Sequence, residues 1–224
     1  RSGLPKRAEP ARIGGFHMFM FNRHLQVKPG HSAEAAPELI DLISRANSIT
    51  GRSATVYSVV LGRFGRMWIA DMFSTHGELM AMNAQLVGDA DFMAAQRSFA
   101  EYLDRPAEDF MARVTHVAGP LREPPGAVAV TNWQVDPRQW GASVAWTHQM
   151  ADAQHASSGI TQTVFTLAEP NPFSIGLCSN ASSIDDIDAA RSGTPDAAVL
   201  QLLESAPGEP TAGSMEGLVA IRIA

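Results

Sequence analysis

The spacing of apolar and polar residues changes along the chain between the period of a strand and that of a helix. Residues 16–30 are rich in aromatic and large apolar side chains and end in a Pro–Gly turn, which is typical of a strand. In 31–51 apolar residues recur at helical spacing, and Gly51 follows as a stop signal. The first half then predicts two strands joined by a Gly-containing turn, a long helical region broken at Gly88–Asp89, and a closing strand: 54–65, 66–73, 74–103 and 112–119.

The same order of elements then recurs, and one strand sequence is nearly repeated. Residues 55–59 read TVYSV, and residues 163–167 read TVFTL. The second half predicts a strand, a helix, two strands, a helical region and a last strand: 127–135, 137–159, 160–170, 173–180, 182–206 and 217–224. Because six elements agree in order, the pattern indicates an internal repeat and not a chance similarity.

These halves predict an α+β protein built from tandem ferredoxin-like repeats, each with the order β-α-β-β-α-β. We expect a flexible N-terminal arm at 1–15, repeats at 16–119 and 127–224, and a proline-rich linker at 120–126. The two helices of such a unit cover one face of its sheet, so the other face needs an apolar partner. One chain would then form an intrachain, pseudo-dimeric α+β barrel. The alternative is two independent ferredoxin-like domains.

Composition and charge narrow the classes of partner. Hydrophobic residues make up 45% of the chain and charged residues 18%, which allows a sizeable core. A formal net charge of −6 gives no reason to expect binding to nucleic acid or to an anionic membrane. The single cysteine, Cys178, excludes an internal disulfide and argues against a zinc–thiolate site. No apolar run is long enough to span a membrane and no signal peptide is recognisable, so we expect a cytoplasmic protein.

Motifs for nucleotide binding and hydrolysis are missing from the sequence. GRFGR at 62–66 lies between two predicted strands, where it is typical of a hairpin turn and not of a phosphate-binding loop. Neither G-x-S-x-G nor H-E-x-x-H occurs. The chain is therefore expected to work without a tightly held cofactor or to accept one in an open pocket.

Two stretches of the first half resemble the antibiotic-biosynthesis monooxygenase superfamily, whose members form dimeric α+β barrels. VKPGHSAE at 27–34 is similar to the strand end that leads into the first helix of that family, and 67–92 is similar to its strand, turn, helix and short acidic segment. The family often has Trp where Phe73 stands, and His where Met82 or Asn83 stands. Among two-unit members, the chain most resembles oxygenases that open ring B of angucycline-type aromatic polyketides, which are themselves similar to anthrone oxygenases.

This resemblance implies an oxygenase of aromatic polyketide antibiotic biosynthesis, which inserts oxygen into a polycyclic phenol or quinone and opens a ring. Dioxygen and a diffusible reduced flavin, FADH2 or FMNH2, would be co-substrates, with a flavin reductase as a partner and no metal. We expect an oily chamber between a sheet and its covering helices, in a monomer or a homodimer. The alternatives are a non-redox polyketide cyclase or small-molecule-binding barrel, and a haem protein of the duplicated-barrel class.

Polar residues within apolar strands are the first candidates for chemistry. Asn22 and His24 are two residues apart and share one face of a strand, which His17 does not share. Asn132 and Gln134 look like the equivalent pair in the second half. Amides could orient phenol or quinone oxygens, and a neutral His can remove a phenolic proton. The alternative is that these strand ends face solvent.

Further candidates follow in the next predicted elements. Trp68 has a flat ring that could stack on a polycyclic substrate, and Met72 adds adaptable apolar surface, although core packing explains both residues equally well. His76 and Asn83 are seven residues apart on one helix face, where the His could serve as acid or base. Trp133 could wall a second pocket or belong to the core. We therefore expect catalytic roles for Asn22, His24, His76 and Asn83, and substrate binding by Trp68, Met72, Asn132, Trp133 and Gln134.

One predicted helix of the second half carries His148, Asp152 and His155 at positions i, i+4 and i+7. This spacing suits a metal-ligand set or an axial haem ligand, and a solvated helix face explains the same residues. The second half also has few basic residues and a Ser/Asp-rich segment at 182–188, which favours a structural role for it.

Overall fold

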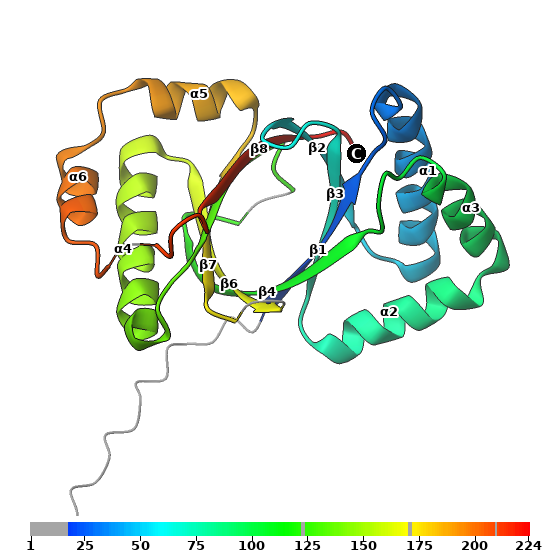
Figure 1. Ribbon diagram of the computed structural model, residues 1–224, viewed down its shortest axis with the longest axis horizontal. Helices are drawn as coiled ribbons and strands as arrows, with labels where there is room; N and C mark the ends of the chain where they lie inside the picture. The colour runs from blue at the N-terminus through cyan, green and yellow to red at the C-terminus, as the bar shows by residue number, and fades with distance from the viewer. Residues whose placement is uncertain (1–17, 122–123, 170–171, 209) are drawn as a thin grey trace, which may run out of the picture.

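The computed structural model describes residues 18–121, 124–169, 172–208 and 210–224 (Figure 1). The expected arm at 1–15, His17 and part of the expected linker lie outside these residues. The strands are β1 (Met18–Gln26), β2 (Thr55–Leu61), β3 (Arg66–Phe73), β4 (Glu108–Ala118), β5 (Ala127–Gln134), β6 (Thr161–Glu169), β7 (Ser174–Ala181) and β8 (Glu216–Arg222). The helices are α1 (Ser32–Thr50), α2 (His76–Gly88), α3 (Ala90–Ala100), α4 (Trp140–Ser158), α5 (Ile184–Ser192) and α6 (Ala197–Glu204), with a 3-10 turn η1 (Pro137–Gln139) before α4.

All eight strands form one closed antiparallel barrel, in the order β1-β3-β2-β8-β5-β7-β6-β4. The first half supplies the neighbours β4-β1-β3-β2, and the second half supplies β8-β5-β7-β6 in the corresponding arrangement. The halves join edge to edge through the pairs β2–β8 and β4–β6. The expected intrachain α+β barrel is confirmed, and two independent domains are excluded because the halves share these strand pairs. Closure pairs both edge strands of each half, β2 with β8 and β4 with β6.

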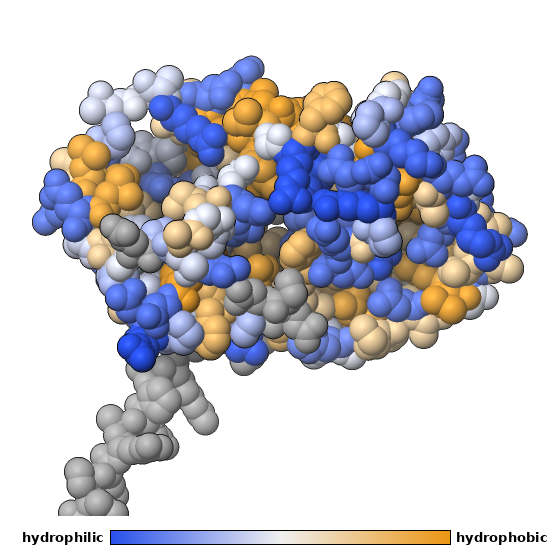
Figure 2. Space-filling model, viewed as in Figure 1, coloured by the Kyte–Doolittle hydropathy of each residue, from blue (hydrophilic) through white to orange (hydrophobic). Residues whose placement is uncertain are grey.

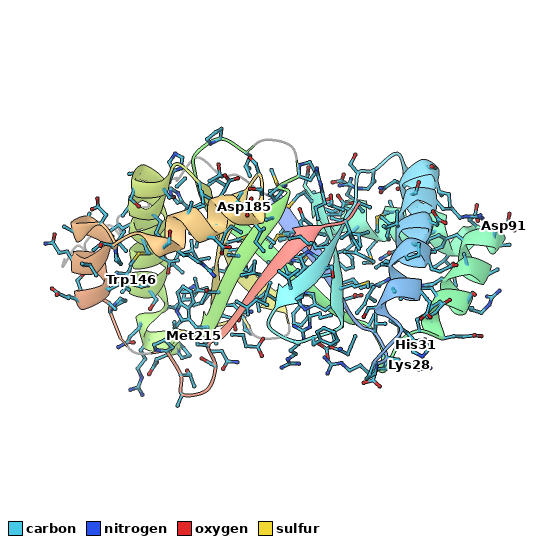
Figure 3. The ribbon with its side chains drawn as sticks, turned by 90° about the horizontal axis from the view of Figure 1, so that it is seen from above. Lys28, His31, Asp91, Trp146, Asp185 and Met215 are labelled. Atoms are coloured by element: carbon cyan, nitrogen blue, oxygen red, sulfur yellow. The ribbon has the colours of Figure 1, made fainter. Side chains whose placement is uncertain are left out.

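The helices cover the outside of the barrel on two opposite sides. Helices α1 to α3 lie against one half and α4 to α6 against the other (Figure 1), and a view from above shows the strands crossing the middle of the molecule between them (Figure 3). Buried side chains such as Leu39, Phe92 and Phe99 fill the space between helices and sheet. The expectation of a chamber between a sheet and its helices is therefore wrong, because that space is packed and the open space lies inside the barrel.

Strand β4 begins at Glu108, earlier than the expected start at 112. The strand begins with the acidic residues Glu108 and Asp109, which interrupt the apolar alternation that would mark its start. Arg23 of β1 donates two hydrogen bonds to the carboxylate of Asp109, at 2.7 and 2.8 Å, beside the register pair His24–Glu108. The longer strand matters for the site, because it includes Phe110, which pairs in register with Asn22 and whose ring contacts His24.

The helices are short and have clear boundaries. The predicted break is confirmed, since α2 ends at Gly88 and the side chain of Asp89 accepts a hydrogen bond from the Phe92 N–H to cap α3. Thr75 caps α2 by accepting from the Glu78 N–H. In the part of the chain that the structure describes, no helix has the length and apolar character needed to cross a bilayer.

Candidate active site

The barrel encloses a cavity of about 820 Å³. Side chains from all eight strands line it, so it belongs to both halves of the chain. Figure 2 shows the molecule hollowed over the middle of the barrel, with hydrophilic residues around the opening. A volume of this size is typical of sites for drug-sized or cofactor-sized ligands, which occupy about 300–1,000 Å³.

Strand alternation decides which residues face the cavity. Residues two apart on a strand share a face, so Asn22 and His24 of β1 point the same way. The strands paired on either side extend this inward face. The lining residues on the strands of the first half are Met18, Met20, Asn22, His24, Thr55, Tyr57, Arg66, Trp68, Ala70, Asp71, Met72, Glu108, Phe110 and Val114. Its loops add Gly51, Arg52, Ser53 and Arg63. The second half adds chiefly apolar groups together with Asn132, Thr163, Cys178, Asn180 and the acidic Glu216.

One wall of the cavity is aromatic. The rings of His24 and Trp68 are stacked, with centroids 5.8 Å apart and an interplanar angle of 16°. Phe110 contacts His24 on one side, at 4.6 Å between centroids, and Tyr57 contacts Trp68 on the other, at 5.3 Å. Four neighbouring strands therefore place one ring each in a continuous row, which suits a flat apolar guest.

Three buried nitrogen atoms in this wall have no hydrogen-bond partner among the described residues. They are His24 Nδ1, Arg66 Nε and Trp68 Nε1. A buried polar group without a partner costs about 1–3 kcal/mol, so such groups are rare unless a ligand or water completes them. Their gathering on the inward faces of two adjacent strands marks this wall as the polar contact surface of the cavity.

Burial controls the charges inside the cavity. Desolvation, followed by the charges of Arg66 and Arg63, lowers the pKa of His24 to about 4, so the imidazole is neutral at pH 7. Burial raises the pKa of the Cys178 thiol to about 12, and burial also raises the pKa of Tyr57. At neutral pH these three side chains carry no charge.

The opposite end of the cavity is held by an ion-pair network. Arg52, which follows α1, donates to Asp71 of β3 at 2.7 Å and also binds Glu78 of α2 and the carbonyl of Met72. Its guanidinium lies over the Phe73 ring, 4.1 Å from the centroid. These contacts join α1, β3 and α2 where Met72 meets the cavity. They give this end a fixed shape.

Five of the predicted site residues line the cavity, and four do not. Asn22, His24, Trp68, Met72 and Asn132 come together inside the barrel, although they belong to three strands and both halves. This convergence could not be deduced from spacing alone, because it depends on how the barrel closes.

The two predicted residues on α2 lie outside the barrel. His76 is exposed at the first turn of α2, where its ring contacts Phe19 at 4.4 Å between centroids. Phe19 is on the outward face of β1, so His76 is separated from the cavity by the sheet. Asn83 lies further along the same helix and does not line the cavity. Both were expected at the site because the chamber was expected on the helix side.

The two residues that end β5 also lie elsewhere. Trp133 faces outward and makes an edge contact with Trp146 at 6.5 Å. Trp146 stands on α4 toward α6, where its indole N–H donates to the Leu202 carbonyl (Figure 3). Gln134 lines a separate, open hollow beside η1. Trp133 therefore belongs to the core beneath α4, which is one of the two roles predicted for it, and does not line a pocket in the barrel.

The histidines of α4 do not form one cluster with a shared centre. His148 Nε2 lies 3.0 Å from Thr115 Oγ1, and its ring stacks on His116 at 4.8 Å. Asp152 Oδ1 lies 2.7 Å from His116 Nε2, whereas His155 Nδ1 lies 3.0 Å from the carbonyl of Ile160. Among the described residues, no group of three His, Cys, Asp or Glu side chains is placed to hold one metal ion.

Sequence reasoning missed Arg66 and Tyr57 at this site. Arg66 was predicted as the first residue of the strand 66–73 and was also counted in the turn GRFGR, but it was not named as a site residue. In the structure it begins β3 and lies two residues before Trp68 on the same face. Alternation along that strand was a usable signal. For Tyr57 no comparable signal existed, because its neighbour Val56 is also buried and the pattern does not say which face is inside.

The fold is similar to several solved structures, although no protein-family model and no curated protein matches the chain. A proposed monooxygenase from Fusobacterium nucleatum subsp. nucleatum aligns with a TM-score of 0.69 and 8% identity, over 92% of this chain and 93% of that one. An anthrone oxidase-like protein aligns with a TM-score of 0.67 and 14% identity, over 93% and 92%. A chlorite dismutase variant from Candidatus Nitrospira defluvii gives 0.60 and 9%, over 93% and 91%. At these identities the likeness shows the shared barrel fold, and chemistry has to be argued from the site.

Proposed function

We propose that the protein is an oxygenase that acts on a polycyclic aromatic polyketide, of the angucycline type, inside the barrel. The observation that carries this proposal is the aromatic wall with three unpartnered nitrogens in a cavity of about 820 Å³. A flat guest with oxygen atoms at its edge would stack on the rings and complete those nitrogens. Structures of the same fold that are described as a proposed monooxygenase and an anthrone oxidase-like protein make oxygen chemistry the favoured reaction class.

The roles follow from where each side chain lies. Trp68 and Met72 would contact the faces and edge of the ring system, while Asn22 and Asn132 offer amide groups to phenol or quinone oxygens from opposite halves of the barrel. His24 is neutral, so it can accept a phenolic proton or donate a hydrogen bond to an oxygen. Walls of apolar side chains keep bulk water away from the reacting carbon.

A reduced flavin is the proposed co-substrate, delivered by a separate flavin reductase. When bound, it supplies the electrons for the reduction of dioxygen. The row of rings formed by His24, Trp68 and Phe110 suits the flat ring system of a flavin, and Arg66 suits its phosphate. The residues present therefore fit a transient flavin, which would share the cavity with the substrate or precede it.

We also interpret the two halves as repeats of one ferredoxin-like unit. The support is the matching order of elements and the matching strand order, β4-β1-β3-β2 and β8-β5-β7-β6. The row of rings comes from the first half alone, and the second half supplies mainly the facing apolar wall. Repeats that had diverged in this way would carry one site and not two.

The test is a product analysis with an angucyclinone and chemically reduced flavin, in air and under nitrogen. Oxygenated or ring-opened product should form only in air, and His24→Gln should lower the yield at least tenfold. His31→Gln is the matched control, because His31 is an exposed histidine at the start of α1 on the flank of the molecule (Figure 3). No product with native protein in air would remove the oxygenase proposal.

The alternatives give different outcomes in the same assay. Product that forms equally under nitrogen without flavin indicates a non-redox cyclase, and binding without conversion indicates a small-molecule-binding barrel. A haem protein of the duplicated-barrel class would give a Soret band on haem addition that His148→Ala or His155→Ala removes. Both imidazoles already have hydrogen-bond partners in the fold, Thr115 and the Ile160 carbonyl respectively. We therefore expect no such band.

A further inference from the structure

Arg66 is a buried cation that forms no ion pair with any of the described residues. Its residue exposure is 6%, and its Nε has no hydrogen-bond partner among the described residues. A buried charge is strongly disfavoured unless it is paired. Burial, together with the nearby charge of Arg63, lowers the pKa of Arg66, and a guanidinium still stays protonated in proteins at neutral pH. The fold therefore keeps a positive charge in a position that destabilises the protein when nothing is bound.

The carboxylates nearby are already engaged by other arginines. Glu216 pairs with Arg63 at 3.2 Å, and Glu108 pairs with Arg105 at 3.4 Å. In the described residues, neither carboxylate lies within ion-pair distance of Arg66, and each acts on it only at longer range. One positive charge is thus left over at this end of the cavity.

The position of Arg66 places its charge in the cavity, where a ligand could contact it. Arg66 lies two residues before Trp68 on the inward face of β3, and it lines the same cavity. His24 on the neighbouring strand feels the charge of Arg66 and presents a second unpartnered nitrogen. An arginine, a neutral imidazole and an indole N–H converge there, and all three can donate hydrogen bonds to an oxygen at the edge of a ring system.

We propose that Arg66 anchors an anionic oxygen of a planar aromatic ligand, so that the cavity takes its guest as an anion. This deepens the proposed oxygenase function, on which it rests for the identity of the guest as a polycyclic phenol or quinone. An ionised phenol is more electron-rich than its neutral form, which favours attack on oxygen. The O–H bond would break with loss of the proton to solvent, and the electron pair would stay on the oxygen beside the guanidinium.

The anchor also resolves a difficulty with His24. An imidazole whose pKa is about 4 in the empty cavity is a weak proton acceptor for a phenol. Arg66 stabilises the phenolate and so lowers the pKa of the bound phenol, so that a weakly basic His24 is enough to accept its proton and pass it to solvent. Two ligands carry a suitable anion on a flat ring system, namely an ionised phenol of the substrate and the phosphate of a flavin. The shared chemistry is an anionic oxygen, and the experiment separates the two sources.

The first arm follows the ionisation of a bound probe by its colour. The probe is 1,2-dihydroxyanthraquinone, titrated with native protein, Arg66→Met, Arg66→Lys and Arg45→Met across pH 5 to 10. In native protein we expect the pH of half-ionisation of the bound phenol to fall by about 1–3 units, as beside any fixed positive charge. Arg66→Met should abolish the fall, and Arg66→Lys should keep part of it. Arg45→Met removes an equal charge from the exposed face of α1 and should behave as native protein.

The second arm compares FMN with riboflavin, which lacks the phosphate. If the phosphate is the anion, Arg66→Met weakens FMN binding at least tenfold and leaves riboflavin unchanged, while the phenol shift is small. If the phenol is the anion, Arg66→Met abolishes the phenol shift and leaves FMN and riboflavin binding unchanged. Either pattern supports the anchor. Removal of an unpaired buried charge should leave the fold intact, which circular dichroism checks. Should Arg66→Met unfold, Arg66→Lys and Arg66→Gln carry the comparison.

Two results would overturn the anchor. One is a bound phenol that ionises at the same pH in native protein and in Arg66→Met, together with equal affinities for FMN. The other is a probe that binds neither protein. The oxygenase proposal fails separately. A clear ionisation shift without any oxygenated product leaves the anchor and removes the function. Oxygenated product, with neither an ionisation shift nor a loss of FMN affinity in Arg66→Met, leaves the function and removes the anchor.

Discussion

The imidazole of His24 stacks on the indole of Trp68 across the β1–β3 ladder, with centroids 5.8 Å apart and planes within 16° of parallel. Neither His24 Nδ1 nor Trp68 Nε1 has a partner among the described residues. Native folds seldom leave two such neighbouring groups unsatisfied in a wall they could have packed with apolar side chains. We therefore expect a bound ligand to supply the missing hydrogen-bond partners of this pair, and variants of each residue can test this.

Replacement of Trp68 by Phe should separate binding from stability. The change loses packing but also removes a buried N–H that has no partner, so we expect the free energy of unfolding to change by less than about 1.5 kcal/mol. Affinity for a hydroxyanthraquinone should fall roughly tenfold, since a hydrogen bond of about 1.4 kcal/mol is lost in the complex alone. Urea unfolding and absorbance titration measure the two quantities.

Trp133→Phe is the matched control for that change, because Trp133 packs outside the barrel against Trp146. It should leave the affinity unaltered. A loss of stability well above about 1.5 kcal/mol in Trp68→Phe with unchanged affinity would instead mark Trp68 as ordinary core.

The pH dependence of stability should carry a contribution from His24. Its pKa is about 4 in the folded protein and about 6.5 when unfolded, so the unfolded chain binds the extra proton first as the pH falls. The contribution is fully present above pH ~6.5 and is lost progressively down to about pH 4, by up to about 3 kcal/mol. His24→Gln should be free of this loss.

Urea unfolding of both proteins at pH 7, 5.5 and 4.5 checks this prediction. The pKa of His148 is also lowered, by burial and then by His116, but that effect is common to both proteins and cancels in the comparison. Parallel stability curves for native protein and His24→Gln would show that His24 is not buried as a neutral group.

The ion pair at the other end of the cavity should matter more than those on the surface. Arg52→Met leaves Asp71, whose side chain is 9% exposed, without its cation, and should cost about 3 kcal/mol of unfolding free energy. Arg63→Met breaks the pair with Glu216, which is more than half exposed on both sides, and should cost less than about 1 kcal/mol. Thermal or urea unfolding distinguishes these values. The double variant Arg52→Met/Asp71→Asn should recover part of the loss, and equal costs for the two single variants would contradict the argument.

Strand patterns predicted much of the architecture and part of the site, for a local reason. Alternation along one strand is a property of the backbone, so Asn22 with His24 could be assigned to one face without any knowledge of the rest. The repeated order of elements likewise predicted the barrel, because each sheet needs a partner for its second face. Neither argument says which face becomes the inside.

That choice depends on contacts between distant segments. The two halves join edge to edge through β2–β8 and β4–β6, and this closure turns the face that carries His24 inward. His76 and Asn83 were expected at the site because the helix side was taken for the chamber, yet large apolar residues fill it. The isolation of Arg66 also emerges only in three dimensions, since it requires knowing that Arg63 and Arg105 have taken the nearby carboxylates.

A last prediction concerns the wall that faces the aromatic row. Gly176 of β7 lies opposite Phe165 of β6, and a Cβ at Gly176 would lie 2.0 Å from Phe165 Cζ. Gly176→Ala should therefore push the Phe165 ring, which lines the cavity, into the space a guest needs. We expect a loss of about 1–3 kcal/mol in unfolding free energy from overpacking, and a weaker affinity for the hydroxyanthraquinone. Gly141→Ala, at a helix position with nothing within 4 Å of the new Cβ, should gain about 0.5–1 kcal/mol and bind normally. Calorimetric titration of the three proteins decides the matter: equal affinities would mean that the ligand does not occupy the barrel.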